Sequence, residues 1–519
     1  MKNVRIDWKD YVTKHSGLIL LSVITSVLCF GFLALDANIR IDTEELINTP
    51  GTTLGWLRIG RFGLVLFKRF LGLSTHHAWL SGLLFLLFFN LSGNLLTFLF
   101  YHVSGKNEKY PYWVFLLLYS TSNIWCYQIY FSLQQAEVAL ALFLIALAAF
   151  LAFEGSFIAR GFWGFVCQLF AGILLIVGFG AYQAFVAYYI AVCVSAFLLY
   201  LFNRHTSDLR ALFSGTGKLL ASFAFSYGIY LWIAKTWFMS TGEYLTGQMG
   251  WGRLTAAGCI KNIVKTVQRV VICRGSEYFS FYTIGAVFTA VAVIMICRRN
   301  FAKNRLKCVL CAASAFGLML TPFLMTVYMG EFVVTRAQFA LPVASAFLGM
   351  YGIGELTAVS GKKFAALSSL LAFVFMLVQF AYCMQLTYTD DVRYREDVLF
   401  ADDVLHTISE TCGENAVKKP FVFVGRRIPK LKRGCTRTEM FGWSFFEWDY
   451  HPAMQTGATH RIVGFLNAYA DAGFKELRDE TLLLEAEKAA KELPVYPEKK
   501  SVLETKDYIL VHLSDEDEG

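Results

Sequence analysis

The stretch LILLSVITSVLCFGFLALDANIRIDTEE, residues 18–45, contains the pattern that decides the fold. Residues 18–35 are almost wholly apolar, and a helix of that length crosses a hydrocarbon layer of about 30 Å. Four carboxylates follow within ten residues: Asp36, Asp42, Glu44 and Glu45. Charged groups pressed against a bilayer are costly unless they have a partner or a function. The stretch therefore predicts a membrane-spanning helix followed at once by a polar site at the membrane surface.

Apolar segments of similar length recur through most of the chain, which has 519 residues, 56% of them hydrophobic and 17% charged. One soluble core cannot bury so many long apolar runs, whereas a helix satisfies its own backbone hydrogen bonds inside a bilayer. We therefore predict a mostly α, polytopic membrane helix bundle. Hydropathy places about eleven spans, at residues 17–35, 79–101, 112–130, 136–153, 162–179, 183–202, 217–238, 279–297, 308–328, 340–357 and 365–386.

The basic residues predict how these spans are oriented. Lys2, Arg5 and Lys9 precede the first span and no small-residue cleavage site follows it, so we interpret this span as an anchor rather than a removed signal peptide. A cytoplasmic N-terminus then places most other basic residues in short cytoplasmic loops, as the positive-inside rule requires. Topology accounts for the net charge of +8, which therefore does not indicate nucleic-acid binding.

This orientation puts two loops, 36–78 and 240–279, outside the cytoplasm, together with everything after the predicted transmembrane domain, 1–387. Residues 388–519 have the composition of a soluble domain, with short strands near 421–425 and 508–513 and a helix near 481–492. We expect a small extracytoplasmic α/β domain there, attached to a protein of the cell membrane. Disulfides can form in that compartment, and the candidate pairs are Cys259 with Cys273 and Cys412 with Cys435.

The first external loop is predicted to contain an amphipathic helix lying in the membrane surface, over residues 54–71. At about 100° per residue its four basic side chains fall on one stripe, namely Arg58, Arg61, Lys68 and Arg69. In the second loop, Lys261, Lys265 and Arg269 recur at four-residue intervals opposite aliphatic residues. Both helices are expected to contact lipid headgroups.

Acidic residues directly after the first span, followed by Gly55-Trp56 and Gly60-Arg61, resemble the first external loop of the GT-C superfamily of integral-membrane glycosyltransferases. More narrowly, the chain is similar to the bacterial family that includes the serotype-converting O-antigen glucosyltransferases. Tyr182-Gln183 after an apolar run, a late external Arg336 before Pro342 and a small C-terminal domain extend this likeness over the whole chain.

The resemblance implies an inverting transfer of a sugar, commonly glucose, from a polyprenyl-phosphate carrier to a surface glycan or teichoic-acid-like polymer outside the membrane. Such a reaction needs a carboxylate to accept the proton of the acceptor hydroxyl and cations to stabilise the departing phosphate. Since the lipid tail of the donor stays in the bilayer, both groups must sit at the interface. The expected partners are therefore the lipid-linked donor, a glycan acceptor and the bilayer.

We assign Asp42 as the candidate general base, with Glu44 or Glu45 orienting the acceptor or sharing that role. Arg61 is the first candidate for the phosphate, and Arg40, Arg336 and Arg58 are the alternates. The competing explanation is that the three carboxylates only favour the start of the interfacial helix through its dipole. No tightly bound cofactor is expected, although the acidic cluster could hold a divalent cation beside the phosphate.

Several further polar residues are candidates for the wall of the same cavity: Asp36, Tyr182, Gln183, Glu137 and Glu331. Each also has a structural explanation. Tyr182-Gln183 could form an interhelical hydrogen bond, Glu137 could be a snorkelling carboxylate, and Glu331 could pair with Arg336. His460 lacks metal-ligand spacing and is interpreted as a surface residue.

Two other functions fit a chain of this kind. A transporter or flippase of lipid-linked glycans would also have many spans and polar residues within them, but transporters usually show repeated halves and broken helices at the bilayer midplane. Here the two halves do not match, and the acidic residues cluster at one face. A membrane scaffold or sensor that acts through the C-terminal domain is the third alternative.

Overall fold

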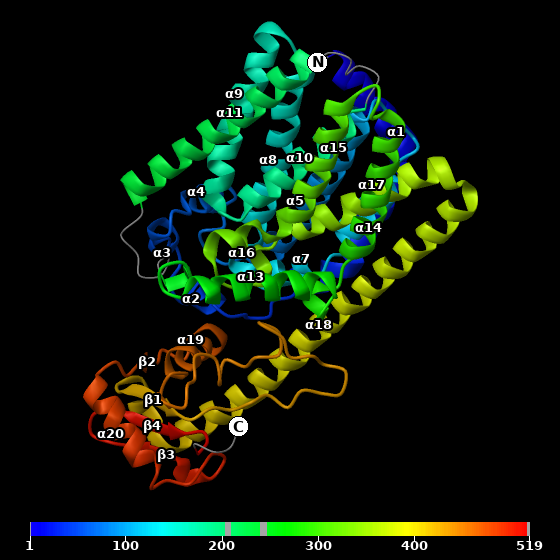
Figure 1. The fold of residues 1–519 in the computed structure, drawn as a ribbon. Helices are drawn as coiled ribbons and strands as arrows, with labels where there is room; N and C mark the ends of the chain where they lie inside the picture. The colour runs from blue at the N-terminus through cyan, green and yellow to red at the C-terminus, as the bar shows by residue number, and fades with distance from the viewer. Residues whose placement is uncertain (1, 203–208, 239–246, 516–519) are drawn as a thin grey trace.

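A computed structural model describes residues 2–202, 209–238 and 247–515 of the chain. Parts of three predicted regions lie outside these residues, namely 240–246 of the second external loop, 203–208 of a cytoplasmic loop and 516–519 of the C-terminal domain. In Figure 1 a bundle of helices is connected to a smaller C-terminal region by one long helix, α18. The candidate site lies at the first external segment, next to the C-terminal region.

Nine helical segments among the described residues are long and apolar enough to cross a membrane. This result confirms the predicted polytopic helical fold. The segments are built on α1 (Lys2–Leu35), α5 (Ala78–Val103), α8 (Gln135–Phe153), α9 (Gly161–Ala181), α11 (Leu209–Ile233), α14 (Tyr282–Asn300), α15 (Arg305–Leu320), α17 (Ala340–Ser360) and α18 (Lys362–Cys412).

Two of the predicted spans have a different form. The sixth is α10 (Phe185–Tyr200), which has 16 residues. The third is broken into α6 (Tyr112–Ser120) and α7 (Ile124–Ile129) by the polar residues 121–123. The hydroxyl of Thr121 donates to the carbonyl of Leu117 at 2.9 Å, and its Oγ1 lies 3.0 Å from Oε1 of Gln379. A bond of the first kind also occurs inside the unbroken helix α5, from Thr97 to Gly93, so it accompanies the break without causing it.

The first external segment contains three short helices, α2 (Thr43–Asn48), α3 (Leu54–Arg58) and α4 (Phe62–Phe70). The prediction of one interfacial helix over 54–71 is therefore wrong. Gly60, with φ of 77°, reverses the chain between α3 and α4, in a conformation that favours glycine. Helix α4 then packs tightly on α9, because a Cβ on Gly63 would lie only 2.1 Å from the carbonyl oxygen of Val177.

The basic side chains that were predicted to share one stripe of this segment lie in different environments. Lys68 is 1% exposed and forms an ion pair of 2.6 Å with Glu137 of α8, so its charge points into the protein rather than toward headgroups. Arg58 and Arg69 are exposed. The second external segment follows its prediction more closely. Helix α13 (Ala256–Val271) begins at a Thr255 cap and exposes its three basic residues, Lys261, Lys265 and Arg269.

Helix α18 leads out of the bundle into the C-terminal region. Its 51 residues extend about 77 Å at 1.5 Å per residue, far beyond a hydrocarbon layer of about 30 Å, so its second half must lie outside the bilayer. The helix passes without interruption through the predicted domain boundary at 387/388.

The C-terminal region is built on a four-stranded sheet of order β2-β1-β4-β3. β1 is parallel to β2 and β4, and β3 is antiparallel to β4. Side chains of β1 alternate between two cores: Phe421 and Phe423 join the large core, whereas Val422 and Val424 pack under α20. The bounds are β1 (Pro420–Val424), α19 (Thr459–Ala470), β2 (Lys475–Glu476), α20 (Glu480–Ala490), β3 (Val502–Glu504) and β4 (Ile509–His512).

A buried chain of charges connects the first external segment to α18. Nε of Arg40 lies 2.7 Å from a carboxylate oxygen of Asp390, and its Nη2 lies 2.6 Å from Asp36. Asp390 also pairs with Arg393, which reaches Asp397 at 3.3 Å. Asp397 accepts hydrogen bonds from Ser444 of the C-terminal region, so the network continues into that region.

The cysteines do not form the two candidate disulfides, because all twelve are free. Cys259 and Cys412 are buried. Cys273 is directed to backbone carbonyl oxygens, with its Sγ 3.5 Å from that of Ser280. These side chains are therefore part of the packing.

We expect Asp390→Ala to destabilise the protein by about 3–5 kcal/mol, because it leaves Arg40 and Arg393 buried without their common partner. The matched control is Asp391→Ala, whose side chain is 41% exposed and pairs only with Arg395 at the surface. The expected loss of stability for this control is about 0–1 kcal/mol. Thermal unfolding of the purified full-length protein in detergent measures both. Equal melting temperatures for the two variants would contradict the structural role of the network.

Candidate active site

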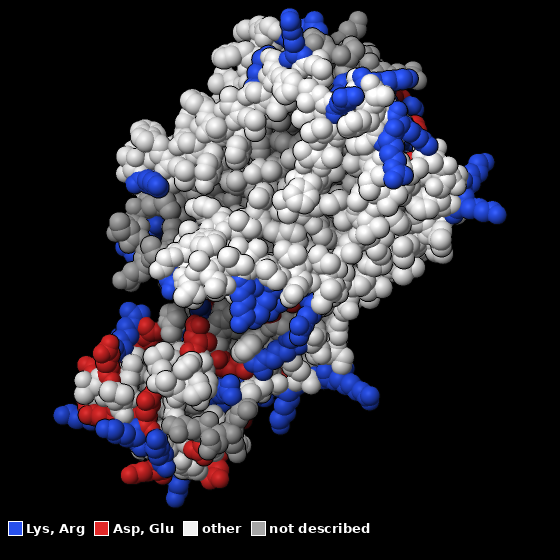
Figure 2. All heavy atoms as spheres, viewed as in Figure 1, with Lys and Arg blue, Asp and Glu red and all other residues white. Residues whose placement is uncertain are grey.

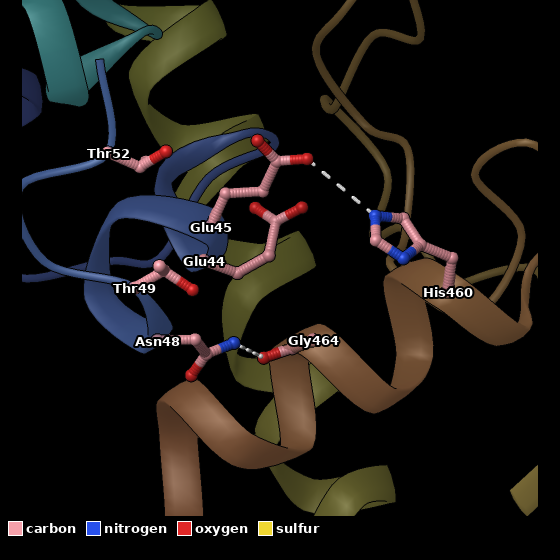
Figure 3. A pocket seen from close by; sticks show the side chains of 7 residues that line it. All are labelled: Glu44, Glu45, Asn48, Thr49, Thr52, His460 and Gly464. Carbon is pink, nitrogen blue, oxygen red and sulfur yellow. Dashed lines mark hydrogen bonds and ion pairs between the residues drawn. The ribbon is translucent and has the colours of Figure 1, made fainter. Parts of the chain in front are cut away.

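Two neighbouring cavities involve the first external segment, and the smaller of them also contacts the C-terminal region. The larger, which we call the arginine cavity, has a volume of about 470 Å³, within the range of about 300–1,000 Å³ typical of small-molecule sites. Its lining includes Asp42, Glu45, Trp56, Arg58, Arg61, Gln134 and Arg336. The smaller, the glutamate groove, measures about 260 Å³ and is lined by Glu44, Glu45, Asn48, Thr49, Thr52, His460 and Gly464 (Figure 3).

Asp42 reaches the arginine cavity because of an unusual backbone conformation. Its φ of 68° and ψ of −14° lie in the left-handed region, which Asp tolerates better than most residues. The chain turns there and enters α2, whose first turn contains Glu44 and Glu45. The positive end of the helix dipole favours carboxylates at this position. The carboxylates thus lie at the start of α2 and not of the predicted interfacial helix, and Asp42 makes no side-chain capping hydrogen bond there.

Arg61 lies at the start of α4, directly after the Gly60 turn. Its guanidinium stacks over the ring of Tyr182, 4.3 Å from the ring centre, and its Nε has no hydrogen-bond partner. The adjacent Gln183 donates to the carbonyl of Ile59 at 2.8 Å. Tyr182 and Gln183 therefore hold the segment that carries Arg61 in place. They contact this segment but do not line the cavity.

Arg336 enters the same cavity from the opposite half of the chain. It lies in the 3₁₀ turn Thr335–Ala337 and its guanidinium stacks on Phe131, 3.9 Å from the ring centre. Stacking on a ring holds a guanidinium in place without neutralising its charge. Within residues 2–202, 209–238 and 247–515, none of Arg58, Arg61 and Arg336 forms an ion pair with a carboxylate. The cavity therefore contains three arginines without ion-pair partners, beside the carboxylates of Asp42 and Glu45.

The C-terminal region supplies a further cation to the acidic cluster. Nη1 of Arg461, on α19, lies 3.0 Å from Asp42 and 2.7 Å from Glu44, and its Nε lies 2.7 Å from Asp449. Glu44 is 1% exposed. Burial raises the pKa of Glu44 to about 7, and the charge of Arg461 opposes that rise. Its carboxyl group therefore titrates near neutral pH.

His460 forms the other wall of the glutamate groove. Nε2 of His460 lies 3.6 Å from Glu45, and Nδ1 lies 2.6 Å from Glu476. The hydrogen bond with Glu45 is the main cause that raises the pKa of His460 to about 9, and the same contact lowers the pKa of Glu45. His460 is half-exposed, as the sequence suggested, yet it belongs to the site.

Four predicted site residues have structural partners instead and line neither cavity. Arg40 and Asp36 pair with each other in the buried network, so Arg40 is not free to bind a phosphate. Glu137 is paired with Lys68. Glu331 contacts Arg253 at 2.9 Å and not Arg336, so the predicted alternative of a Glu331–Arg336 pair is wrong.

Sequence reasoning missed the contribution of α19. Arg461 and Glu44 are 417 residues apart in the chain, and no local pattern marks the contact. The only sequence signal was the unexplained His460-Arg461 pair at the start of a helix. In the part of the chain that the structure describes, no group of three or more His, Cys, Asp or Glu side chains is placed to hold a metal ion.

Comparison with known proteins gives one match. A family model described as Glucosyl transferase GtrII matches residues 31–353, more than half of the chain. The matched region contains Asp42, Arg58, Arg61 and Arg336 but ends before the C-terminal region. No curated protein and no solved structure matches.

The raised pKa of Glu44 predicts a specific pH dependence of stability. Between its ordinary value of 4.5 and about 7, the folded protein binds a proton that the unfolded chain has lost, so this group makes stability fall as pH rises. We expect Glu44→Gln to remove that fall, which amounts to about 3 kcal/mol at most. Thermal unfolding from about pH 5 to about pH 8 measures this fall in stability. Glu492→Gln, at an exposed position, is the control. A difference from wild type that stays constant with pH would contradict the assignment.

Proposed function

This chain belongs to the glucosyl transferase GtrII family, and we propose that it transfers glucose, with inversion, from a polyprenyl-phosphate carrier to a surface glycan or teichoic-acid-like acceptor. The proposed site is the arginine cavity, with Asp42 as general base. The observation that carries the proposal is the position of Asp42 in the same cavity as three arginines without carboxylate partners.

The three arginines suit the leaving group of this reaction. When the bond between the anomeric carbon and the phosphate oxygen breaks, negative charge grows on the phosphate, and guanidinium groups already in place stabilise it without rearranging. Arg61 and Arg336 are held by ring stacking on Tyr182 and Phe131. Arg58 lines the same cavity and is exposed, so a lipid phosphate can reach it.

Asp42 suits the other half of the reaction. In an inverting transfer the acceptor hydroxyl attacks the face of the anomeric carbon opposite to the phosphate, and its proton must leave at the same time. Asp42 is 40% exposed, and it pairs with Arg461, a cation that keeps the carboxylate in place. Glu44 is turned toward Arg461 and lines only the groove, so Asp42 and Glu45 are the carboxylates that face the donor.

The charge distribution supports an outward-facing site. Figure 2 shows Lys and Arg side chains at the end of the bundle that lies away from the C-terminal region. Basic residues there include Arg298, Arg299, Lys362 and Lys363, at the ends of helices that turn back into the bundle. By the positive-inside rule that end is cytoplasmic. The two cavities and the C-terminal region would then be extracytoplasmic, where a lipid-linked sugar meets a surface polymer.

We expect Asp42→Asn to lower the turnover of transfer by about 10²- to 10⁴-fold, because the amide keeps the shape of the side chain and cannot accept the proton. The assay is transfer of labelled glucose from a short-chain polyprenyl-phosphate donor by the purified protein. Binding of the donor should persist, since the three arginines are unchanged. Near wild-type turnover by this variant would contradict Asp42 as the base.

We expect Arg61→Ala to lower turnover by about 10²- to 10³-fold, as removal of a preorganised charge at a developing anion does in other enzymes. Arg69→Ala is the matched control, because Arg69 lies on the same helix, α4, is exposed and lines neither cavity. Its turnover should stay within about twofold of wild type. Equal losses in the two variants would mean that the effect comes from headgroup contact and not from the cavity.

A further inference from the structure

The glutamate groove is a second polar site that the donor does not need. It lies between α2 of the first external segment and α19 of the C-terminal region (Figure 3). We propose that it binds the acceptor, and that the acceptor unit it takes is a neutral sugar ring rather than a phosphate-bearing unit. This inference rests on the proposed function and names the acceptor class for that same site.

One buried atom indicates that the groove can accept a hydrogen bond from a ligand. Oε1 of Glu44 is 2.7 Å from Arg461, but Oε2 of the same carboxylate is buried and has no hydrogen-bond partner. A buried polar atom without a partner costs about 1–3 kcal/mol, so such atoms are rare unless something binds them. Glu44 lines the groove, and its carboxylate points toward the space between the two helices in Figure 3. A sugar hydroxyl would donate to this oxygen.

The other lining groups also suit hydroxyls, each of which both donates and accepts a hydrogen bond. Asn48 donates its Nδ2 to the carbonyl of Gly464 at 2.8 Å, and this bond leaves its Oδ1 as an acceptor. Thr49 and Thr52 have hydroxyl groups on the same side of the groove, as Figure 3 shows. The groove of about 260 Å³ is smaller than sites for drug-sized ligands and is suited to a single ring.

Charge selects against an anionic acceptor unit. The two carboxylates of the groove, Glu44 and Glu45, would repel a phosphate placed between them. The two nearby cations are already engaged, Arg461 with Asp42, Glu44 and Asp449, and His460 with Glu45 and Glu476. The arginine cavity instead contains three arginines without ion-pair partners, and these favour the donor phosphate there.

The groove also has the correct position for an acceptor. It shares Glu45 and Thr52 with the arginine cavity, so a ring bound there lies beside the donor sugar. Helix α19 approaches α2 closely at Gly464, where a Cβ would lie 3.1 Å from Cγ of Glu44. The C-terminal region therefore forms one wall of the acceptor site, and differences in α19 would change acceptor choice without changing the donor.

The test uses the full-length protein in nanodiscs and Thr49→Trp, which fills the groove from an exposed position. Thr411→Trp, at an exposed position on α18, is the matched control. The probes are a panel of neutral methyl hexopyranosides and, as the anionic comparison, glycerol 3-phosphate. Saturation-transfer NMR reports binding without any donor present.

We expect at least one neutral hexopyranoside to bind to wild type and to Thr411→Trp, and its dissociation constant to rise about tenfold or more in Thr49→Trp. Unchanged binding in Thr49→Trp, tighter binding of glycerol 3-phosphate than of every hexopyranoside, or no binding of any hexopyranoside to wild type would overturn the proposal. Glucose transfer from the polyprenyl-phosphate donor is measured separately. Hexopyranoside binding without transfer would overturn the proposed reaction but leave the groove assignment intact.

Discussion

The buried network of Arg40, Asp390, Arg393 and Asp397 is the constraint on which the rest of the architecture depends. These side chains are at most 1% exposed, so each charge must be matched by its neighbours or the fold loses several kcal/mol. Arg40 belongs to the first external segment, Asp390 to the long helix α18, and Asp397 bonds to Ser444 of the C-terminal region. One set of ion pairs therefore fixes three parts of the chain at the point where they surround the site.

The site is assembled around that fixed point from elements that are distant in sequence. The segment held by Arg40 continues directly into Asp42 and α2, while α18 leads to the C-terminal region that presents α19 to α2. Arg336 arrives from a third part of the chain. The consequence is a difference in charge: the arginine cavity combines three arginines without ion-pair partners with Asp42 and Glu45, whereas the glutamate groove contains Glu44 and Glu45 beside His460.

Much of the site could be inferred from the sequence because its central residues lie close together in one segment. Asp42, Glu45, Arg58 and Arg61 fall within the 20-residue stretch 42–61, and all four line the arginine cavity. Within the site, the predictions that failed concern which charges are paired. Lys68 and Arg40 look like their neighbours in sequence, but each is neutralised by a carboxylate from another helix, Glu137 and Asp390. Nothing local distinguishes a paired arginine or lysine from a free one.

The sequence by itself determined the membrane-spanning fold and the position of the acidic segment, because hydropathy and charge act over about 20 consecutive residues. It also indicated the strands and the helix of the C-terminal region through short periodic patterns. Only the tertiary structure decided which charges remain unpaired and that Arg461 and His460 close the site from the far end of the chain. The reason is physical: the free energy of a charge depends on the burial and partners that packing creates, and those partners are hundreds of residues away.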